Sequence, residues 1–403
     1  MKVTIDKLNY MGKGICRYNN KVMFVPYTLP KDEVLVTTFK ESKRYDDARV
    51  VKFIKKSDGH IKPLCPYYER CGGCNYMHTS YESELDFKLN NIREIFNNNG
   101  FYPEIMEITK GERFYYRNKV TLNVTSNKLC YFMEKSHEAV FISECVLCDH
   151  KINDIIKVLL SIDLSNVLRV TIRNFVNSMV IFEVKDDVNL DISKLSLVDS
   201  VLIKNGENYK VVKNDSYLIS RVSDFTFHVE KDSFFQVNKF LTAKLYDKIL
   251  DFLEPSTKDS VLDLYCGSGS IGIYVSRMVH DVIGVEINRE SIKSANINKE
   301  INGISNISFI NGDVSKIIND VRKVDKVIVD PPRSGLDKNT IYNLIRLRPQ
   351  RIVYVSCNIH SLVKNLKDLS KYYDVIKVNP VDMFACSYHV ECVSLLQRKD
   401  FEK

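Results

Sequence analysis

Two residues near the C-terminus are well suited to covalent chemistry. Cys357 follows the apolar segment 352–355, which predicts its thiol just past the carboxyl end of a buried strand. A cysteine in that position can act as a nucleophile. Glu391 immediately precedes the apolar run 392–396, and a carboxylate there can accept a proton. A structural thiol and a surface carboxylate are the alternatives.

A thiol and a carboxylate together suit one reaction of pyrimidines. C5 of uracil is a poor nucleophile, but a thiolate that adds to C6 turns the ring into an enolate, and C5 can then attack a methyl sulfonium. A base must remove the C5 proton before the thiolate can leave. Cys357 and Glu391 are the candidates for these two roles.

A glycine-rich segment predicts a cofactor site. Residues 261–264 form an apolar strand, and Gly267, Gly269 and Gly272 then spell G-x-G-x-x-G. Glycines there let the backbone pass close to a ligand. Glu286 ends the next predicted strand, where its carboxylate can accept hydrogen bonds from both ribose hydroxyls of an adenine nucleoside. This pattern alone does not separate NAD from S-adenosylmethionine.

A later segment favours the methyl donor. Asp330-Pro331-Pro332-Arg333 follows the predicted strand 326–329. A carboxylate followed by two prolines makes a rigid ledge beside the cofactor cleft. Similar Asn/Asp-Pro-Pro ledges recur in methyltransferases that act on nucleobases.

A third group of residues has the spacing of metal ligands. The pattern is Cys65-x5-Cys71-Gly72-Gly73-Cys74, with Cys145 as the best candidate for a fourth thiolate and Cys148 as the alternative. Four thiolates suit a [4Fe-4S] cluster. They equally suit tetrahedral zinc, for which Cys71, Cys74, Cys145 and Cys148 would make a paired C-x-x-C site.

These residues need elements to position them. From about residue 240 the chain alternates compact apolar strands with helical segments, which predicts a doubly wound, mainly parallel sheet. Ligands of such sheets bind outside the carboxyl ends of the strands. Residues 115–222 are mostly strand-like, with 168–173 and 179–184 as a hairpin pair, and a helix is predicted from Tyr81 to about Asn98.

The N-terminal unit carries the charge of the molecule. Short β-segments and turns over residues 1–56 predict a small OB-type barrel. Residues 1–62 hold 14 Lys/Arg and 7 Asp/Glu, whereas the other 341 residues hold 44 of each. The basic residues are interleaved with Tyr10, Tyr18, Phe39 and Tyr45, a composition typical of single-stranded nucleic-acid binding. The alternative is a barrel with core aromatics and solvated lysines.

Length and composition exclude several classes. A chain of 403 residues predicts two or three domains, and 44% hydrophobic with 27% charged residues is ordinary for a globular protein. No apolar run approaches the ~20 residues that span a bilayer, and the N-terminus lacks a signal-peptide core. We therefore expect a cytoplasmic protein without membrane contact, whose 11 cysteines are ligands or nucleophiles rather than disulfides.

Over its whole length the chain resembles the RNA 5-methyluridine methyltransferase family, in particular the branch acting on bacterial 23S ribosomal RNA. The resemblance is carried by the motifs above and by 116–119 (YRNK) and 234–238 (FFQVN). It implies an N-terminal TRAM domain that binds RNA and a [4Fe-4S] cluster on Cys65, Cys71, Cys74 and Cys145. It also implies contacts to S-adenosylmethionine from Gln236, Tyr265, Glu286 and Asp330, with Cys357 as nucleophile and Glu391 as proton acceptor.

The resulting prediction is a three-part enzyme. A TRAM-like barrel (1–56) and a central α+β iron–sulfur domain (57–230) precede an α/β Rossmann-like methyltransferase domain (231–403). It would form 5-methyluridine in 23S ribosomal RNA as a monomer. Transfer RNA is the alternative substrate, and a nicotinamide-dependent RNA-modifying oxidoreductase is the alternative of another class. The chain departs from the family pattern at Ile359, Ala385, Ser387 and Met77.

Overall fold

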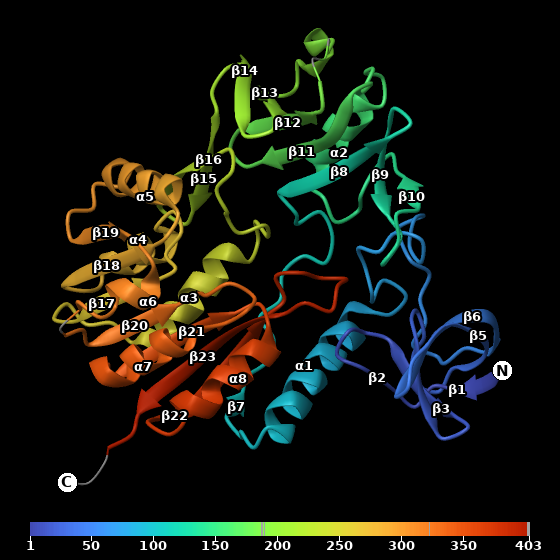
Figure 1. The fold of residues 1–403 in the computed structure, drawn as a ribbon, viewed down its shortest axis with the longest axis horizontal. Helices are drawn as coiled ribbons and strands as arrows, with labels where there is room; N and C mark the ends of the chain where they lie inside the picture. The colour runs from blue at the N-terminus through green and yellow to red at the C-terminus, as the bar shows by residue number, and fades with distance from the viewer. Residues whose placement is uncertain (187, 189, 322, 401–403) are drawn as a thin grey trace.

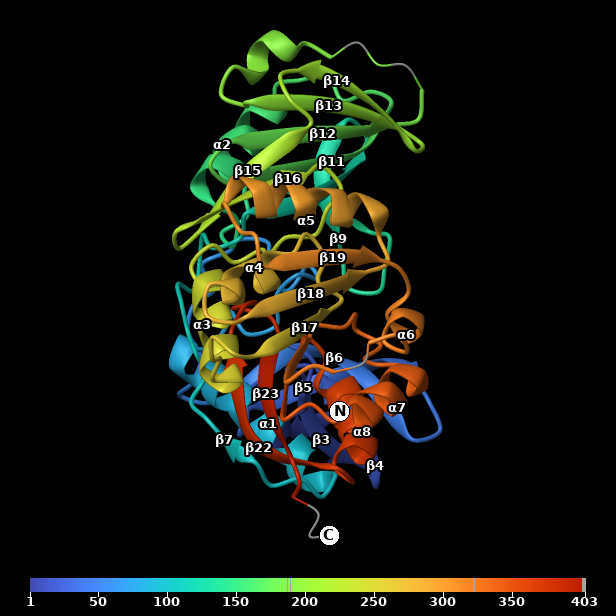
Figure 2. The same ribbon diagram turned by 90° about the vertical axis from the view of Figure 1, so that its left-hand side faces the viewer.

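The computed structural model describes residues 1–186, 188, 190–321 and 323–400. Figure 1 shows three parts: an N-terminal barrel in blue, a central antiparallel sheet in green at the top, and a C-terminal sheet with helices in yellow to red. The view turned by 90° shows the central sheet stacked above the C-terminal one (Figure 2).

The N-terminal barrel is a six-stranded sheet in the order β1-β5-β6-β4-β3-β2. Its strands are β1 (Lys2–Thr4), β2 (Lys7–Leu8), β3 (Gly14–Tyr18), β4 (Lys21–Val25), β5 (Glu33–Glu41) and β6 (Tyr45–Lys55). The sheet packs on a small core that includes Cys16, Val25 and Val34. The four aromatic residues singled out from the sequence, Tyr10, Tyr18, Phe39 and Tyr45, are all exposed rather than core residues.

A cysteine-rich segment without helices or strands, residues 57–80, connects the barrel to α1 (Tyr81–Asn98). The hydroxyl of Ser80 accepts a hydrogen bond from the Ser83 amide and starts the helix, whose bounds match the prediction. Ile92 and Phe96 of α1 share a core with Leu366 of α8 (Ile359–Leu369). The short strand β7 (Glu104–Ile105) then pairs with β22 (Tyr373–Val381) of the C-terminal sheet.

The central sheet has seven strands in the order β10-β9-β8-β11-β12-β13-β14. They are β8 (Lys119–Thr125), β9 (Lys128–Phe132), β10 (Ala139–Phe141), β11 (Val167–Asn174), β12 (Ser178–Val184), β13 (Ser200–Asn205) and β14 (Asn208–Lys213). The predicted hairpin is the antiparallel pair β11 and β12. Helix α2 (His150–Leu159) shares a core with this sheet, and η1 (Ile192–Leu195) contributes Leu195 to it.

A two-stranded hairpin, β15 (Tyr217–Val222) and β16 (Phe225–Glu230), links the two large sheets. Asn298 and Asn302 of α5 (Arg289–Ile301 and its C-cap) hydrogen-bond the backbone of His228 and Thr226 in the hairpin. These amides fix the hairpin on the C-terminal part.

The C-terminal sheet is doubly wound and mainly parallel, as predicted, in the order β19-β18-β17-β20-β21-β23-β22-β7. Its further strands are β17 (Ser260–Leu264), β18 (Asp281–Glu286), β19 (Ile307–Asn311), β20 (Lys326–Val329), β21 (Arg351–Ser356) and β23 (Glu391–Arg398). The remaining helices are α3 (Thr242–Leu253), α4 (Ser270–Ser276), α6 (Val314–Ile317) and α7 (Lys338–Leu347). Separate hydrophobic cores lie on the two faces of the sheet. The strand order reverses between β17 and β20, which places the expected ligand crevice there.

The domain boundaries at residues 56 and 230 remain a prediction. Two segments of the predicted central domain, α1 and β7, pack on the C-terminal sheet, which a reading along the chain does not anticipate. In the described part of the chain, no helix combines the length and the apolar character needed to cross a bilayer.

Candidate active site

Strand register brings the two candidate reactive residues to one edge of the sheet. Strands β21 and β23 are antiparallel, with Val355 opposite Val393 and Ser356 opposite Cys392. Extending this register by one residue puts Cys357 opposite Glu391. The parallel strand β20 ends at Val329, beside Tyr354 of β21, so Asp330 follows at the same edge. Asp330, Cys357 and Glu391 therefore meet at the carboxyl end of the parallel strands.

The environment of Cys357 disfavours its thiolate in the absence of substrate. Burial raises the pKa of the thiol, the charge of Glu391 raises it further, and the guanidinium of Arg333 lowers it. Glu391 is 5% exposed, and burial raises its pKa well above the usual range. The charge of Asp330 adds to that rise, whereas Arg333 opposes it. Arg333 is thus the cation that favours the charged forms of both groups.

Arg333 is held beside a neutral histidine. Its Nη2 lies 3.3 Å from Nε2 of His389. Burial lowers the pKa of His389 to about 4, and Arg333 contributes to that lowering. The side-chain amide of Asn358, the residue after Cys357, donates to the Arg333 carbonyl at 2.9 Å. These contacts fix Arg333 over the Cys357 end of β21.

The glycine loop between β17 and α4 has the backbone shape of a ligand-binding turn. Tyr265, Gly267 and Gly269 have φ values of 63°, 53° and 77°. A left-handed conformation costs a residue with a bulky side chain, so the loop stores strain at Tyr265. The Gly267 amide donates to Oε2 of Glu286 at 3.3 Å, and the Asn288 amide donates to Oε1 at 2.7 Å. The Glu286 carboxylate therefore lies directly against the loop.

Two carboxyl groups near this loop, Asp263 and Asp330, have pKa values raised by burial. Asp263 has no exposed surface, and the backbone amide of Gly272 in α4 lies near its carboxylate. Burial raises the pKa of Asp263 to about 8 and the pKa of Asp330 to about 7. Acidic groups gathered beside a glycine turn suit a cationic, donor-rich ligand such as S-adenosylmethionine. Asp263 belongs to the strand before the glycine loop, but the sequence pattern alone does not single it out as a site residue.

Gln236, another residue of the predicted cofactor set, precedes α3 and lines a cavity of its own. Its segment is fixed by Asn118, whose side chain donates to the Gln236 carbonyl at 3.0 Å, and by Arg173, which donates to the Ser233 carbonyl. Gln236 lines a cavity of about 310 Å3 with Asn118 and Phe175, between the central sheet and the hairpin.

A second cavity, of about 510 Å3, opens over Cys357. Its volume lies within the ~300–1,000 Å3 typical of small-molecule sites. The lining comes from three parts of the chain: the barrel, α1, and the edge of the C-terminal sheet that carries Asp330, Cys357 and Glu391. This edge is called the catalytic edge. The lining includes Tyr10, Arg333, Cys357, His360, Tyr388 and His389. Polar, cationic and aromatic groups together suit a nucleobase.

The four predicted metal ligands also lie together. Cys65, Cys71, Cys74 and Cys145 all line one small cavity of about 50 Å3, together with Arg117, whereas Cys148 is fully buried outside it. The carbonyls of Cys145 and Cys148 accept hydrogen bonds from the Asn153 side chain, which fixes this loop. In the described part of the chain no His, Cys, Asp or Glu side chains are arranged as a ready metal-ion site.

The donor set nevertheless fits an anionic cluster. Four thiolates around iron and sulfide carry net negative charge, and they need a compensating cation when buried. Arg117 is buried beside the thiols, and its Nε has no partner among the described residues.

A loop joins the cysteine site to the catalytic edge. Residues 382–390 connect β22 to β23 and thus end at Glu391. The carbonyl of Cys386 accepts hydrogen bonds from the amides of Asn75 and Tyr76, which follow Cys74 directly. Ala385 and Cys386 also pack in the hydrophobic cluster around Cys65, Cys74 and Cys145. Cys386 adopts a left-handed φ of 66°, and its burial and backbone hydrogen bonds hold it in that conformation.

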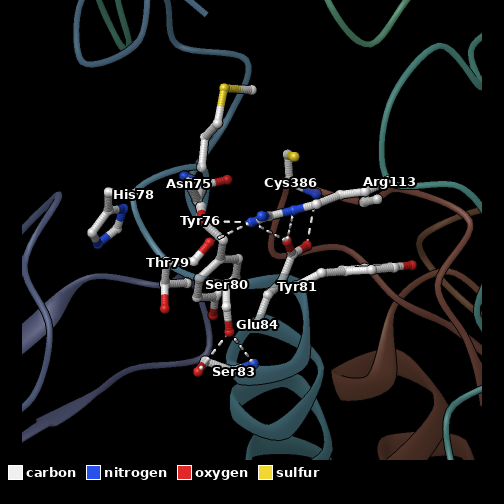
Figure 3. Close-up of polar contacts among 12 residues, drawn as sticks. Asn75, Tyr76, His78, Thr79, Ser80, Tyr81, Ser83, Glu84, Arg113 and Cys386 are labelled. Atoms are coloured by element: carbon white, nitrogen blue, oxygen red, sulfur yellow. Dashed lines mark hydrogen bonds and ion pairs between the residues drawn. The ribbon is translucent and has the colours of Figure 1, made fainter. Parts of the chain in front are cut away.

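Buried charged side chains bind this loop to α1. Figure 3 shows Glu84 of α1 between Arg113 and Cys386. Glu84 Oε1 accepts from the Cys386 amide at 2.6 Å and from Lys88 at 2.7 Å, and Lys88 also reaches Asp382 at 2.6 Å. Glu84 Oε2 accepts from Arg113, which in turn donates to the carbonyls of Tyr76 and Thr79. No local sequence pattern indicates this network, because most of its members are far apart in the chain.

The sheet order, the strained glycine loop with its acidic strand ends, and the Cys–Glu pair at the carboxyl edge define an S-adenosylmethionine-dependent methyltransferase. Comparison with known proteins specifies the type. The family model described as tRNA (uracil-5-)-methyltransferase matches residues 186–399. The model of the TRAM domain of tRNA (uracil(54)-C(5))-methyltransferase matches residues 1–58.

Relatives and solved structures agree. An uncharacterized RNA methyltransferase of Clostridium tetani is 31% identical, over 97% of this chain and 95% of its own. Another, from Halalkalibacterium halodurans, is 29% identical over 99% and 97%. The structure of Pyrococcus abyssi tRNA (uracil-54, C5)-methyltransferase in complex with S-adenosyl-L-homocysteine superposes with a TM-score of 0.82 and 26% identity. That match covers 98% of this chain and all of the other.

The chain belongs to the RNA uracil-C5 methyltransferase family, and it is an S-adenosylmethionine-dependent enzyme with an N-terminal TRAM domain. The predicted Rossmann-like fold with a TRAM domain, S-adenosylmethionine as methyl donor and RNA as partner are confirmed, whereas the iron–sulfur cluster and the ribosomal substrate stay predictions. The literal G-x-G-x-x-G therefore does not indicate a nicotinamide enzyme.

Proposed function

We propose that the protein methylates C5 of a uridine in 23S ribosomal RNA, with Cys357 as nucleophile and Glu391 as base. The observation that carries the proposal is the register that places these two side chains opposite each other beside Asp330. S-adenosylmethionine supplies the methyl group. All other steps use side chains of the protein and atoms of the uracil ring.

The proposed roles follow from the charges at the edge. The Cys357 thiolate bonds to C6, and the electron pair moves to C5 and O4 as an enolate. Once C5 carries the methyl group, Glu391 removes the C5 proton, and the electrons of that C–H bond expel the thiolate. A carboxylate whose pKa is raised by burial is a stronger base than an exposed one. Arg333 stabilises the Cys357 thiolate and the Glu391 carboxylate before the uracil ring enters the site.

The cofactor residues are proposed from the same edge. Glu286 would accept from the ribose hydroxyls, and Tyr265 and Asp330 would flank the adenosine and the sulfonium. Gln236 would close the crevice from the segment that Asn118 and Arg173 position. A cation next to Asp330 would favour the charged form of that carboxyl, whose pKa burial raises to about 7.

We also propose a [4Fe-4S] cluster on Cys65, Cys71, Cys74 and Cys145, supported by their shared cavity and by the unpaired Arg117. Because methyl transfer moves no net electrons, its role would be architectural. The contacts from Asn75 and Tyr76 to Cys386 indicate what it would organise: the loop that ends at Glu391. Reduced thiols suit the cytoplasm, where we place the enzyme as a monomer.

The choice of ribosomal RNA rests on resemblance of the cysteine motif, and transfer RNA is a second candidate. The TRAM domain does not separate the two, because the matching TRAM model is that of a transfer-RNA enzyme. The solved relative with a TM-score of 0.82 is likewise named for transfer RNA.

Mapping 5-methyluridine in ribosomal and transfer RNA, from cells with and without the gene, tests this choice directly. The proposal expects one or more 23S positions to lose the modification while transfer RNA keeps it. Loss confined to transfer RNA would replace the substrate and leave the chemistry intact. Unchanged 5-methyluridine in both would overturn the proposed function.

A further inference from the structure

The barrel contributes an aromatic side chain to the cavity over Cys357. Tyr10 lies between β2 and β3 and is 44% exposed, yet it lines the same cavity as Cys357 and Arg333. Tyr18, Phe39 and Tyr45, the other exposed aromatics predicted to bind RNA, are outside that lining. One of the four barrel aromatics is therefore singled out by its place in the fold.

The loop that carries Tyr10 is rigidly built. The Asn9 side chain accepts hydrogen bonds from the amides of Met11 and Lys13, both at 2.9 Å. The Asn9 carbonyl accepts from the side chain of Asn91 on α1. Gly12, with φ of 76°, packs so tightly that a Cβ there would lie 2.9 Å from the Tyr76 ring. An exposed ring on a fixed loop binds with little loss of entropy.

Tyr10 belongs to a cluster of aromatic rings that lies beside Cys357 and Glu391 but does not include them. Its centroid is 4.6 Å from that of His360 and 6.2 Å from that of Tyr388, both edge-to-face. Tyr388 in turn lies 4.1 Å from His389. His360 is three residues past Cys357, and Tyr388 is three residues before Glu391. When a nucleobase occupies the cavity at Cys357, Tyr10 would lie next to that base.

We propose that Tyr10, His360 and Tyr388 form a second nucleobase subsite, which stacks the nucleotide adjacent to the target uridine. This inference rests on the proposed function. A uridine that enters a pocket leaves its neighbours unstacked, and single-stranded RNA is bound by stacking such bases on aromatic side chains. Stacking accepts any base, so the subsite would position the strand without reading its sequence. The barrel and the catalytic edge would then hold one substrate strand together.

The test is a double-mutant cycle between protein and RNA. The probe is a labelled hairpin carrying the uridine identified by mapping, together with two versions that are abasic immediately 5′ or 3′ of it. Binding is measured with wild type, Tyr10→Ala, Tyr10→Phe and Tyr10→Leu. Tyr18→Ala, a truncation in the same barrel outside the cavity, is the matched control. S-adenosylmethionine binding and thermal unfolding confirm that each variant folds.

The subsite predicts a non-additive result. Wild type should bind one of the abasic hairpins about tenfold more weakly than the intact one, as expected for the loss of one stacked base. Tyr10→Ala should bind the intact hairpin about tenfold more weakly and should lose nothing further with that abasic version. Tyr10→Phe should behave as wild type, Tyr10→Leu should behave as Tyr10→Ala, and Tyr18→Ala should keep the wild-type difference between hairpins.

Two outcomes would overturn the inference. In the first, Tyr10→Ala and Tyr10→Leu bind the hairpin with wild-type affinity. In the second, the affinity losses from the protein change and the RNA change multiply as independent effects. Failure of the proposed function is separate, because it would appear as wild type binding the hairpin without methylating C5.

Discussion

To act as the proposed nucleophile, Cys357 must lose a proton in a site that resists this loss. Burial and the Glu391 charge both raise the pKa of the thiol, so its thiolate fraction grows as the pH rises toward that value. Arg333 is the cation that lowers the pKa of Cys357 and of Glu391. The same side chain also reaches His389, which burial keeps neutral. Arg333 therefore lowers the pH at which the Cys357 thiolate and the Glu391 carboxylate form.

We predict that the single-turnover rate of methylation at saturating RNA rises with pH from mildly acidic to alkaline conditions. Arg333→Ala should shift the inflection to higher pH, because the group that lowers both pKa values is removed. Arg333→Lys retains a positive charge and should shift it less. A profile that is flat for the wild type, or an inflection that moves to lower pH in Arg333→Ala, would contradict this account.

The two reactive residues should fail in different ways. Cys357→Ala removes the attacking thiolate, so no methylation and no covalent RNA adduct should form. Glu391→Gln should still allow addition and methyl transfer, but proton removal should slow by about 10²- to 10⁴-fold. A denaturing gel should then show a protease-sensitive RNA band that carries label from the methyl donor, in Glu391→Gln only. Normal turnover in Glu391→Gln would place the base elsewhere.

At the scale of elements, the loop 382–390 is the part of the catalytic edge with the least structure of its own. It contains no helix or strand, and its position depends on contacts from α1 and from the residues after Cys74. Glu84 is the centre of these contacts, since one carboxylate binds Lys88, Arg113 and the Cys386 amide. Removing its charge leaves two buried cations undercompensated.

We predict that Glu84→Gln lowers the stability by roughly 3–5 kcal/mol, the usual cost of breaking a buried ion pair. It should also slow RNA release more than methyl transfer, because the loop leads into Glu391. Thermal unfolding and the level of covalent adduct at steady state measure the two effects. Glu82→Gln, an exposed change on the same helix, is the control for both. If Glu84→Gln slowed methyl transfer and RNA release equally, the role of Glu84 would be purely structural.

The cysteine site gives a second prediction at this scale. Protein purified without oxygen should be brown, with about four iron and four sulfide per chain. Cys71→Ser should lose both, whereas Cys148→Ser should keep them, because Cys148 lies outside the cavity that the other four share. A colourless protein with one zinc per chain that is lost on Cys148→Ser would instead establish the paired C-x-x-C site.

Over the whole molecule, sequence patterns predicted what local periodicity determines. The alternation of strands and helices after residue 240, the hairpin at 168–184 and the helix from Tyr81 were all found. The edge location of Cys357 and Glu391 followed from strand ends. Their direct opposition did not, because it depends on β23 inserting antiparallel between β21 and β22.

Contacts between distant segments were not predictable in the same way. Tyr10 in the catalytic cavity, Glu84 under Cys386 and β7 on the C-terminal sheet each join residues that no local pattern relates. Asp263 and Arg333 were visible in recognised motifs, but their significance comes from burial and from neighbouring charges. A single sequence reveals neither the burial of these residues nor the charges that surround them.

The charge of the molecule gives the last prediction. The excess of positive charge lies in the first 62 residues, and Lys40, Lys43 and Arg44 are near one turn between β5 and β6. If this turn contacts RNA phosphates, each contact releases counterions and steepens the salt dependence of binding. The triple change of these residues to Gln should weaken RNA binding at moderate salt. It should also reduce the slope of log affinity against log salt by about 0.7–0.9 per lost contact.

The matched control keeps the charge and changes only the side chains: Lys40→Arg, Lys43→Arg and Arg44→Lys together should leave the salt slope unchanged. S-adenosylmethionine binding should be the same in all three proteins, because its proposed site lies on the C-terminal sheet. An unchanged slope in the Gln variant would mean that the basic turn faces solvent in the complex. RNA would then be held by the cavity and its rings alone, and the barrel would act through Tyr10 rather than through its charge.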